Sequence, residues 1–438
     1  MNRTLRRLGI TLAALAAAGC SKHAAINAPA VSGGSASFAA VASVGTSLTA
    51  GFESGGLVVH HQTHGFAYDF AKQVGATYTI PSVSADGLPP LLQIEGWTPQ
   101  GQPIIGNTGR TPGTPTNLLQ PTPYNDMGVP DALLNDLTHD SRYADNTTLF
   151  PVITRAPVLQ LGSILDQVAL LQPTFLTFEF GANEVLGAAA FGLGAPLVDV
   201  PTFSALLHST LDSVAVLMPN AKVAIFNVPD PTTIPFFTTI SPYLDPSGTC
   251  RVIGPGGPLS LGDLVLLTAG DSLAIGTGVP LPCGGNGRPL PAEFVLTAPN
   301  VASIQTAVAG YNSAIQTEAT TRGYALVDFH GLLQRASTSG LALQGHIYTT
   351  EFVIGGLFGL DGVHPTDLGY AFMCNTLIDA VNAKFGARIP SLNLAAYATA
   401  TSSRLIPAYG HDGFPIIRNA RKVYGTIFDW RGLRPPVP

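Results

Sequence analysis

A serine, a histidine and an aspartate in two distant motifs have the chemistry of nucleophilic catalysis. Ser47 lies in residues 45–51 (GTSLTAG), directly after a predicted strand. The glycine before it permits a tight turn of the backbone, and a serine at the end of a strand can expose its hydroxyl at the edge of the sheet. Asp361 and His364 lie in residues 361–365 (DGVHP). At this spacing the carboxylate can accept the Nδ1 proton, which leaves Nε2 free to take the proton of Ser47. We therefore expect Ser47 as nucleophile, His364 as base and Asp361 as the group that orients the base.

Both motifs also have an ordinary structural interpretation. A serine after a strand commonly caps a helix or satisfies the backbone. Asp361 can cap a turn while His364 begins a helix with Pro365 in its first turn. A helix N-terminus disfavours an imidazolium, so this position would help to keep His364 neutral, as a base requires. The catalytic interpretation therefore depends on whether the fold brings the two motifs together.

Two further segments could stabilise the oxyanion that forms when a serine attacks a carbonyl. Residues 180–184 (FGANE) close a strand that reads as buried, and they place the Asn183 amide at the sheet edge expected for Ser47. Residues 124–130 (YNDMGVP) offer the N–H of Gly128, which a substrate can approach closely. Each segment taken alone is also typical of a turn.

The four segments together resemble the SGNH, or GDSL, hydrolase family, whose sequence blocks contribute Ser, Gly, Asn and His in that chain order. The corresponding residues here are Ser47, Gly128, Asn183 and His364. The resemblance covers most of the chain, residues 40–385, and the D-x-x-H-P string is its most specific part. The longer run GGLFGLDGVHP, which ends in that string, resembles a bacterial lipoprotein-type subgroup.

The resemblance implies a three-layer α/β/α fold with a flavodoxin-like parallel sheet. It also implies ester hydrolysis through an acyl-enzyme, by a serine esterase or lipase that needs no metal or other cofactor. The backbone N–H groups of Ser47 and Gly128 and the Asn183 amide would hold the oxyanion. Lipids, acetylated glycans and other small esters are all compatible with such a site.

Two positions depart from the family pattern. Thr46 stands where the first block usually has Asp, and Glu184 stands where the third block usually has Asp after Asn. Neither change removes a proposed catalytic group. Thr49 distinguishes the serine motif from the Gly-x-Ser-x-Gly elbow of α/β-hydrolases, because it occupies the position of the final Gly.

Short apolar runs alternate with helical patterns along the chain, which favours the α/β class with a parallel sheet covered on both faces. We expect strands over residues 37–44, 175–180, 222–227 and 324–328. Apolar spacings of three and four predict helices over residues 66–74, 164–171, 203–217, 304–321 and 366–384.

Two regions interrupt this alternation. Residues 88–105, with EGWTPQGQ at their centre, predict an inserted β-hairpin. Residues 386–438 form a C-terminal extension with Pro and Arg and no clear period. The hydrolase domain is therefore expected over residues 38–385, preceded by a signal peptide (1–19) and a flexible tether (20–37).

The first residues have the layout of an export signal. Three arginines precede an apolar stretch, residues 8–18, that is too short to span a bilayer. It ends in Ala17-Ala18-Gly19-Cys20, which resembles the bacterial lipobox with Ala17 in place of the usual Leu. We expect export with Cys20 lipidated, giving a protein anchored to the outer membrane; plain secretion is the alternative.

If Cys20 carries lipid, three cysteines remain. Cys250 and Cys283 flank a Gly- and Pro-rich insertion, where an oxidising compartment would favour a loop-closing disulfide over separate thiols. Cys374 lies among apolar residues of a predicted helix, so we expect a buried free thiol there.

Composition limits the possible partners. Of 438 residues only 11% are charged, 46% are hydrophobic, and the net charge is −6. No cluster of Lys and Arg is dense enough for a nucleic-acid footprint, so nucleic acid is not an expected partner. An ester substrate and, through the lipid, a membrane are the expected ones.

Two other functions compete with the esterase. His60, His61 and His64 suggest a metal-dependent phosphoesterase, but the next carboxylate along the chain is Asp69, which favours a solvated or cleft-lining loop over a metal site. A non-catalytic surface lipoprotein could retain the fold for binding, although binding alone needs no activated serine. The apolar residues 185–193 could line an acyl pocket, form a lid or pack in the core.

Overall fold

A five-stranded parallel sheet forms the centre of the molecule. The computed structural model describes residues 31–159, 161–192, 197–398 and 413–428. The strands are β1 (Val41–Gly45), β4 (Asp126–Gly128), β5 (Phe175–Glu179), β6 (Lys222–Phe226) and β11 (Ala325–Val327). Their spatial order is β11-β6-β5-β1-β4, which in chain order is the 2-1-3-4-5 arrangement of flavodoxin-like folds. The predicted α/β class is confirmed.

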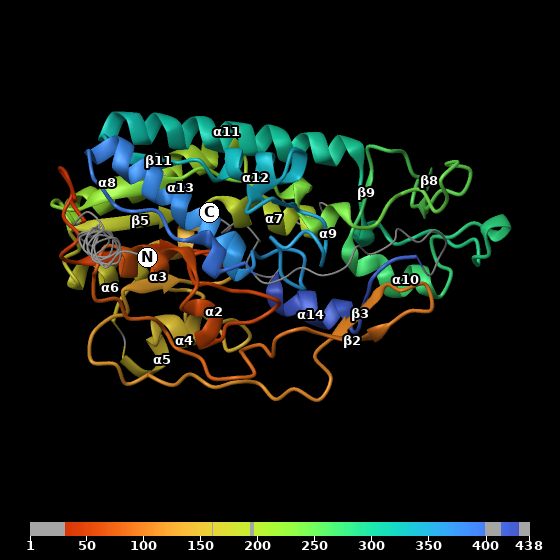
Figure 1. The fold of residues 1–438 in the computed structure, drawn as a ribbon, viewed down its shortest axis with the longest axis horizontal. Coiled ribbons are helices and arrows are strands. Elements are labelled where there is room, and N and C mark those ends of the chain that lie inside the picture. Colours follow the sequence, from red (N-terminus) through yellow and green to blue (C-terminus); the bar gives the residue numbers. More distant parts are fainter. Residues whose placement is uncertain (1–30, 160, 193–196, 399–412, 429–438) are drawn as a thin grey trace, which may run out of the picture.

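Helices cover both faces of the sheet because successive strand residues point to opposite sides. Val41 and Phe175 belong to a core on one face, which is packed under α3 (Phe66–Gln73) and α13 (Asp367–Phe385). Their neighbours Ala42 and Leu176 belong to the core on the other face. That face is covered by α6 (Ile164–Leu170), α8 (Val200–Leu217) and α11 (Ala298–Arg322), of which α11 runs along the top of Figure 1.

The predicted elements are present, with shifts at their ends. Helices α8 and α11 begin earlier than their apolar periodicity indicates, because each has a proline in its first turn, where no intrahelical N–H is required. The Asp199 side chain caps α8 by accepting the N–H of Thr202 at 2.8 Å. Strand β4 was missed, since a three-residue Asp-Met-Gly segment has low strand propensity and is defined by its pairing with β1.

Helix α8 is long and apolar enough to cross a membrane by length and composition, and it is the single such helix in the described ranges. Its buried residues include Phe203, Leu207 and Leu211, which lie in the core beside the sheet. Packing against the sheet and α11 thus explains the apolar residues on the buried face of α8.

The predicted hairpin is β2 (Gln93–Trp97) paired antiparallel with β3 (Pro103–Gly106), with a register shift between Ile94 and Gly96. Strand β14 (Ile416–Ile417), from the C-terminal extension, pairs parallel with β3 and is followed by α14 (Ala420–Ile427). Figure 1 shows these elements and α10 (Gly270–Ala274) together at one end of the molecule. The described residues 413–428 of the extension are therefore part of the folded body.

The remaining elements are short helices and two-stranded ribbons. The helices are α2 (Val59–Gln62), α4 (Phe150–Thr154), α5 (Ala156–Leu159), α7 (Ala182–Ala190), α9 (Pro235–Thr238) and α12 (Phe329–Thr338). The strands are β7 (Ile253–Gly254), β8 (Gly257–Pro258), β9 (Leu264–Val265), β10 (Val295–Leu296), β12 (Leu341–Leu343) and β13 (His346–Tyr348).

The prediction of a flexible tether over residues 20–37 is wrong for the part that the structure describes. Ser32 exchanges backbone hydrogen bonds with Arg388 at 3.4 and 2.8 Å, and the N–H of Ser35 donates to the carbonyl of Phe385 at 2.8 Å. The carbonyls at the C-terminal end of α13 need such donors, because they lack partners within the helix. Residues 31–37 thus dock against the end of α13, and the predicted signal peptide and Cys20 lie outside the described residues.

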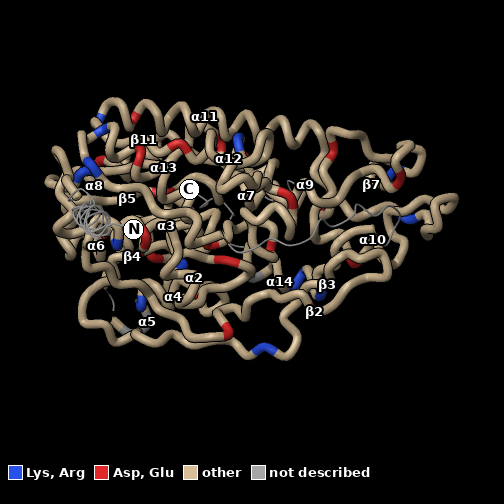
Figure 2. The backbone as a smooth tube through the Cα atoms, viewed as in Figure 1, with Lys and Arg blue, Asp and Glu red and all other residues tan. Residues whose placement is uncertain are grey.

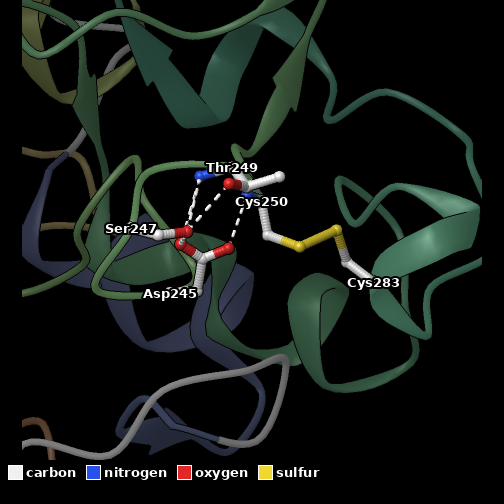
Figure 3. Close-up of a disulfide and its surroundings, with 5 residues drawn as sticks. All are labelled: Asp245, Ser247, Thr249, Cys250 and Cys283. Atoms are coloured by element: carbon white, nitrogen blue, oxygen red, sulfur yellow. Dashed lines mark hydrogen bonds between the residues drawn. A yellow bond between two sulfur atoms is a disulfide. The ribbon is translucent and has the colours of Figure 1, made fainter.

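A disulfide joins Cys250 and Cys283. Asp245 braces the first of these cysteines, because its carboxylate accepts the N–H of Cys250 at 2.6 Å and that of Thr249 at 3.1 Å (Figure 3). Cys374 is a buried free thiol in α13, and burial raises its pKa well above the ordinary value. Elsewhere the few charged residues are interspersed along the chain (Figure 2), which agrees with the low charge content of the sequence.

Candidate active site

Ser47, His364 and Asp361 lie in one chain of hydrogen bonds. The Nε2 atom of His364 is 2.9 Å from Ser47 Oγ, and its Nδ1 atom is 2.9 Å from Asp361 Oδ2. All three residues are buried; Ser47 retains 8% of its surface exposed and Asp361 none. The structure therefore brings together the two motifs that the sequence separates by more than three hundred residues.

The Asp361 carboxylate is held by backbone donors on both oxygens. Oδ1 accepts the N–H groups of Val363 at 2.8 Å and His364 at 2.9 Å, and Oδ2 also accepts the N–H of Gly55 at 2.8 Å. Burial alone would raise the pKa of Asp361, but the His364 ring and these donors outweigh it and hold the pKa below the ordinary value. Asp361 is thus an ionised acceptor that fixes the orientation of the His364 ring.

The loop that carries Asp361 and His364, the base loop, is also held by residues from other parts of the chain. The Tyr424 hydroxyl, on α14 of the C-terminal extension, donates to the Asp361 carbonyl at 2.9 Å. The N–H of Phe236, on α9, donates to the carbonyl of Gly362 at 2.8 Å. On the other side the Phe52 ring packs against the His364 ring with centroids 4.6 Å apart. Three separate elements therefore restrict the loop that carries the base.

A buried glutamate supports the turn that carries the nucleophile. Glu179 ends β5, and its Oε2 atom accepts the Thr46 N–H at 3.0 Å, the Thr46 hydroxyl at 2.9 Å and the Thr49 hydroxyl at 3.1 Å. Burial raises the pKa of Glu179 to about 7, although these donors act in the opposite direction. Thr46, which stands where the family usually has Asp, thus fastens the nucleophile turn to the neighbouring strand.

Asn183 lies in the first turn of α7, directly after β5. Gly181 caps this helix with φ of 111°, and a Cβ there would lie 2.6 Å from Val228 Cγ2, so glycine is required at that position. One N–H of the Asn183 amide donates to the Ala132 carbonyl at 2.8 Å. An amide carries two such hydrogens, which leaves a second donor on the same nitrogen.

The structure does not bring Gly128 to the oxyanion position. Gly128 is the last residue of β4, pairs with Gly45, and donates its N–H to Asp126 Oδ1 at 2.9 Å. It does not line the cavity at Ser47. Its lack of a side chain serves packing instead, since a Cβ would lie 2.4 Å from the Ala50 nitrogen. The Ser47 N–H, by contrast, donates to no residue in the described part of the chain.

The sequence profile of the GDSL-like Lipase/Acylhydrolase family matches residues 41–377. The chain belongs to this family. The predicted family resemblance is confirmed, and the assignment supports a hydrolase function. No curated protein matches the chain.

A structural comparison matches this member of the GDSL-like family with two solved structures at low scores. One is a GDSL-like protein from Parabacteroides merdae, at 12% identity and a TM-score of 0.27, covering 54% of this chain and 69% of the other. The second is LAE5, an α/β hydrolase enzyme from the metagenome of Lake Arreo, at 12% identity and a TM-score of 0.33, covering 78% of this chain and 94% of the other.

The site lies where doubly wound sheets bind ligands. Ser47 follows β1 and Asn183 follows β5, adjacent strands from which the chain connections diverge to opposite sides of the sheet.

Glu184, the second departure from the GDSL-like pattern, has a structural role. Its Oε1 atom accepts the Leu134 N–H at 2.6 Å. Burial raises the pKa of Glu184 to about 7. Glu184 thus anchors the segment beside Ala132, the residue that holds Asn183.

An apolar cavity of about 110 Å³ opens at Ser47. Ser47, Asn183 and His364 lie at its polar end. Thr46 also lines it. The rest of the wall is apolar and comes from several elements; it includes Leu48, Leu186, Ile234, Phe329, Phe372 and Met373. Of the apolar residues 185–193, Leu186 lines this cavity whereas Val185 and residues 188–190 are buried in the core.

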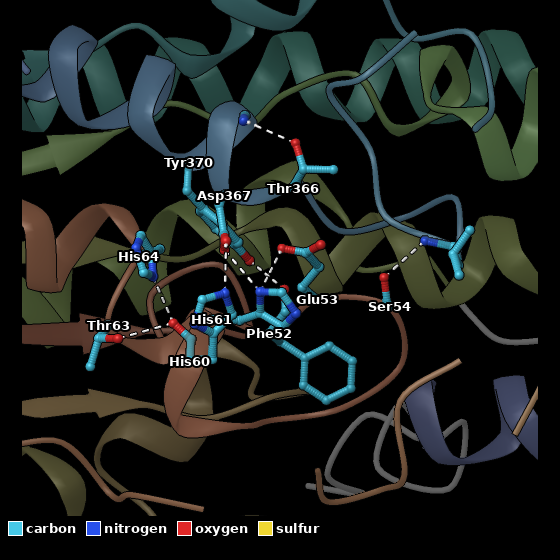
Figure 4. Close-up of polar contacts among 12 residues, drawn as sticks. Phe52, Glu53, Ser54, His60, His61, Thr63, His64, Thr366, Asp367 and Tyr370 are labelled. Atoms are coloured by element: carbon cyan, nitrogen blue, oxygen red, sulfur yellow. Dashed lines mark hydrogen bonds and ion pairs between the residues drawn. The ribbon is translucent and has the colours of Figure 1, made fainter. Parts of the chain in front are cut away.

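Two of the histidines that suggested a metal site contact carboxylates, although the sequence favours a solvated or cleft-lining loop there. His60 and His61 lie on α2, and His61 Nδ1 is 2.9 Å from Asp367 Oδ1 and 3.2 Å from Glu53 Oε2 (Figure 4). Asp69, the nearest carboxylate in sequence, is not part of this group. Asp367 begins the helix after His364, so only the fold reveals the cluster.

Two supporting residues had no clear signal in the sequence. In the sequence, Glu179 is part of a predicted buried strand. The one clue that could have identified it is a charged residue at the end of such a strand, on the sheet edge expected for the serine motif. Tyr424 lies in an extension without apolar period, where nothing indicates contact with residue 361.

Proposed function

We propose that the protein is a serine esterase that hydrolyses carboxylic esters through an acyl-enzyme. The observation that carries the proposal is the continuous chain from Ser47 Oγ through the His364 ring to the Asp361 carboxylate, with 2.9 Å at each link. Nucleophile, base and orienting group are thereby arranged for proton transfer from serine to imidazole.

In the first half-reaction His364 Nε2 takes the hydroxyl proton as Ser47 Oγ attacks the ester carbonyl carbon. The tetrahedral intermediate collapses when the protonated His364 gives that proton to the alcohol oxygen, which leaves with the electrons of the broken C–O bond. In the second half-reaction His364 deprotonates a water that attacks the acyl-serine. The acid is released and the proton returns to Ser47.

The oxyanion would be held by two donors that the structure leaves available. These are the Ser47 N–H and the second N–H of the Asn183 amide, whose first N–H is anchored to Ala132. Gly128 is not part of this proposal, because its N–H already donates to Asp126. Preorganised donors of this kind stabilise charge that develops only in the transition state.

The apolar wall of the cavity favours an ester with a hydrocarbon acyl chain. Its lining combines Leu, Ile, Phe and Met side chains beyond the polar end at Ser47. A polar acyl group would lose hydrogen bonds to water there without replacement. Among p-nitrophenyl esters, kcat/KM should therefore rise from acetate to chains of several carbons.

Ester hydrolysis by wild-type protein and by Ser47→Ala tests the proposal. The variant should lose at least 10³-fold in kcat/KM toward p-nitrophenyl butyrate, roughly the size of effect that removal of a triad member has. Ser43→Ala is a matched control, because Ser43 is a buried serine of β1 outside the cavity. A folded Ser47→Ala protein with the parental rate would refute the mechanism.

We also propose that the protein is exported and anchored through lipid on Cys20. The disulfide between Cys250 and Cys283 supports export, since such bonds persist in oxidising compartments. Metabolic labelling with an alkyne fatty acid in a bacterial host should mark the wild-type protein and not Cys20→Ala. Equal labelling of both would contradict anchoring at Cys20, and release of unlabelled wild type into the medium would indicate plain secretion.

A further inference from the structure

A cluster of metal-ligating side chains lies beside the triad but outside the proposed reaction. The ligand atoms of His60, His61 and Asp367 all lie within 4.8 Å of one another. His61 Nδ1 is 2.9 Å from Asp367 Oδ1, and His60 Nε2 is 3.7 Å from Asp367 Oδ2. Ligand atoms around a tetrahedral zinc ion are roughly 3.3–3.5 Å apart, given bonds of about 2.0–2.2 Å. Small side-chain movements would therefore suffice to enclose a cation.

Glu53 adds a fourth group from within the protein. Its residue surface is 8% exposed, and its Oε2 atom lies 3.2 Å from His61 Nδ1. An Nδ1–H can point at one acceptor, and Asp367 Oδ1 is nearer, so Glu53 Oε2 has no hydrogen-bond partner among the described residues. A buried, unpaired carboxylate oxygen aimed at a histidine nitrogen is a costly arrangement unless something else binds it.

The electrostatics of the cluster favour a cation. No Lys or Arg of the described residues forms an ion pair with Glu53 or Asp367, and the basic side chains nearest to them are histidines. A divalent cation would relieve the repulsion between the two carboxylates.

A second cluster of histidine and carboxylate side chains already contains a cationic side chain. His208 lies 2.8 Å from Glu318 and 3.5 Å from Asp212. There Arg322 contacts both carboxylates at 2.7 Å, so their charge is already balanced. The group around His61 contains no such arginine, although its residue types are similar.

We propose that His60, His61, Asp367 and Glu53 form a binding site for a divalent transition-metal cation, with Zn²⁺ the best match to two imidazole nitrogens and carboxylate oxygens. Mg²⁺ and Ca²⁺ prefer all-oxygen ligands and should bind far more weakly. Figure 4 shows the histidine rings beside the two carboxylates.

The site joins the two loops that carry the catalytic residues. Glu53 follows Phe52, whose ring packs on His364, and Asp367 follows His364 by three residues. The same loops are already linked by the Leu360 N–H, which donates to Ser54 Oγ at 3.0 Å. A bound cation would add a link between them and stabilise the fold without touching Ser47.

Zinc binding to tag-free protein tests this site independently of esterase activity. Titration of chelator-treated protein with ZnCl₂ should show one saturable site per chain. At a Zn²⁺ concentration about a hundredfold above Kd, the melting temperature should rise by about 4 °C. The same binding is expected in the Ser47→Ala background, because no catalytic step is involved.

Variants locate the ion. His61→Ala and Asp367→Asn should lose the saturable binding, and His60→Ala should weaken it at least tenfold; the His60 side chain is 67% exposed, so its removal leaves the fold intact. His208→Ala is the matched control and should bind Zn²⁺ as the wild type does. Binding that survives in folded His60→Ala, His61→Ala and Asp367→Asn, or the absence of saturable binding in the wild type, would overturn the proposal.

Discussion

Asp361 uses both carboxylate oxygens, and each accepts two hydrogen bonds. Asparagine at this position has one acceptor oxygen and an NH₂ group that would face donors. Asp361→Asn should therefore misorient the His364 ring and lower kcat by about 10³- to 10⁴-fold. Steady-state kinetics on p-nitrophenyl butyrate at pH 8 measures the effect.

Asp69→Asn provides the comparison for this variant, because Asp69 is a buried aspartate on α3 outside the triad. It should keep kcat within a few-fold of the wild type. An Asp361→Asn enzyme that kept more than a tenth of the parental kcat would show that Asp361 does not orient the base.

Asn183 is expected to act on the transition state rather than on substrate binding. Its amide is anchored at Ala132 and offers its second N–H to the oxyanion. Asn183→Ala should lower kcat by about 10²- to 10³-fold, or roughly 2.7–4 kcal/mol, with little change in KM. Asn382→Ala, which removes bonds to the backbone of Ile389, should leave kcat unchanged. A raised KM with parental kcat in Asn183→Ala would assign Asn183 to substrate binding instead.

At the residue scale the sequence predicted those groups whose motifs have a distinctive spacing. Asp361 and His364 were recognisable because they are three positions apart on one turn, and Ser47 because a glycine-bearing turn follows a strand. Gly128 was placed wrongly, since a glycine required for close strand packing and one that offers an N–H look identical in sequence. Glu179 was missed because its importance lies in bonds across strands.

The disulfide between Cys250 and Cys283 is a covalent cross-link within the region around residues 240–296. It closes a loop with a sequence separation of 33 and lies outside the cavity. Its loss should cost about 4 kcal/mol of stability while leaving kcat nearly unchanged. Thermal unfolding with and without dithiothreitol measures this.

The double variant Cys250→Ser/Cys283→Ser separates the disulfide from other effects of the reductant. It should melt at the lower temperature in both buffers, because Cys374 is already a free thiol. A wild-type melting temperature that does not change on full reduction would show that this loop contributes nothing to stability.

At the element scale, periodicity predicted the long helices and buried strands but not the short or terminal elements. Strand β4 has three residues with weak strand propensity and is formed through its pairing with β1. Helix α14 contacts the base loop through Tyr424, a long-range contact that no local pattern encodes. Local sequence thus specified the scaffold, whereas the supports of the site depend on tertiary structure.

Three buried carboxyl groups contribute to the pH dependence of the stability of the whole molecule. Burial raises the pKa of Asp126, Glu179 and Glu184 each to about 7. Because these pKa values lie above the unfolded ones, the protonated groups favour the folded state below about pH 4, and that stability is lost as the pH rises through 7. The free energy of unfolding should therefore fall as the pH rises from 4 to 7, with a slope of at most about 1.4 kcal/mol per pH unit for each group.

Urea unfolding at pH 5, 6, 7 and 8 measures this slope, and Glu179→Gln tests its origin. Glutamine stays neutral at every pH. The slope of the free energy of unfolding against pH should therefore decrease in this variant by the contribution of about one proton. Asp361 acts in the opposite sense, because its pKa is lowered, and it affects stability only below about pH 4. Stability that rises from pH 5 to pH 8, or an unchanged slope in Glu179→Gln, would contradict the assignment of these carboxyl groups.

Fluorophosphonate labelling followed by peptide mass spectrometry tests the central claim most directly, because such probes react with an activated serine. The wild-type protein should carry one covalent adduct, on Ser47, and His364→Ala should label at least a hundredfold more slowly. Ser47→Ala should carry none. A folded wild-type protein that fails to label, or an adduct on another serine that persists in Ser47→Ala, would show that Ser47 is not the activated nucleophile.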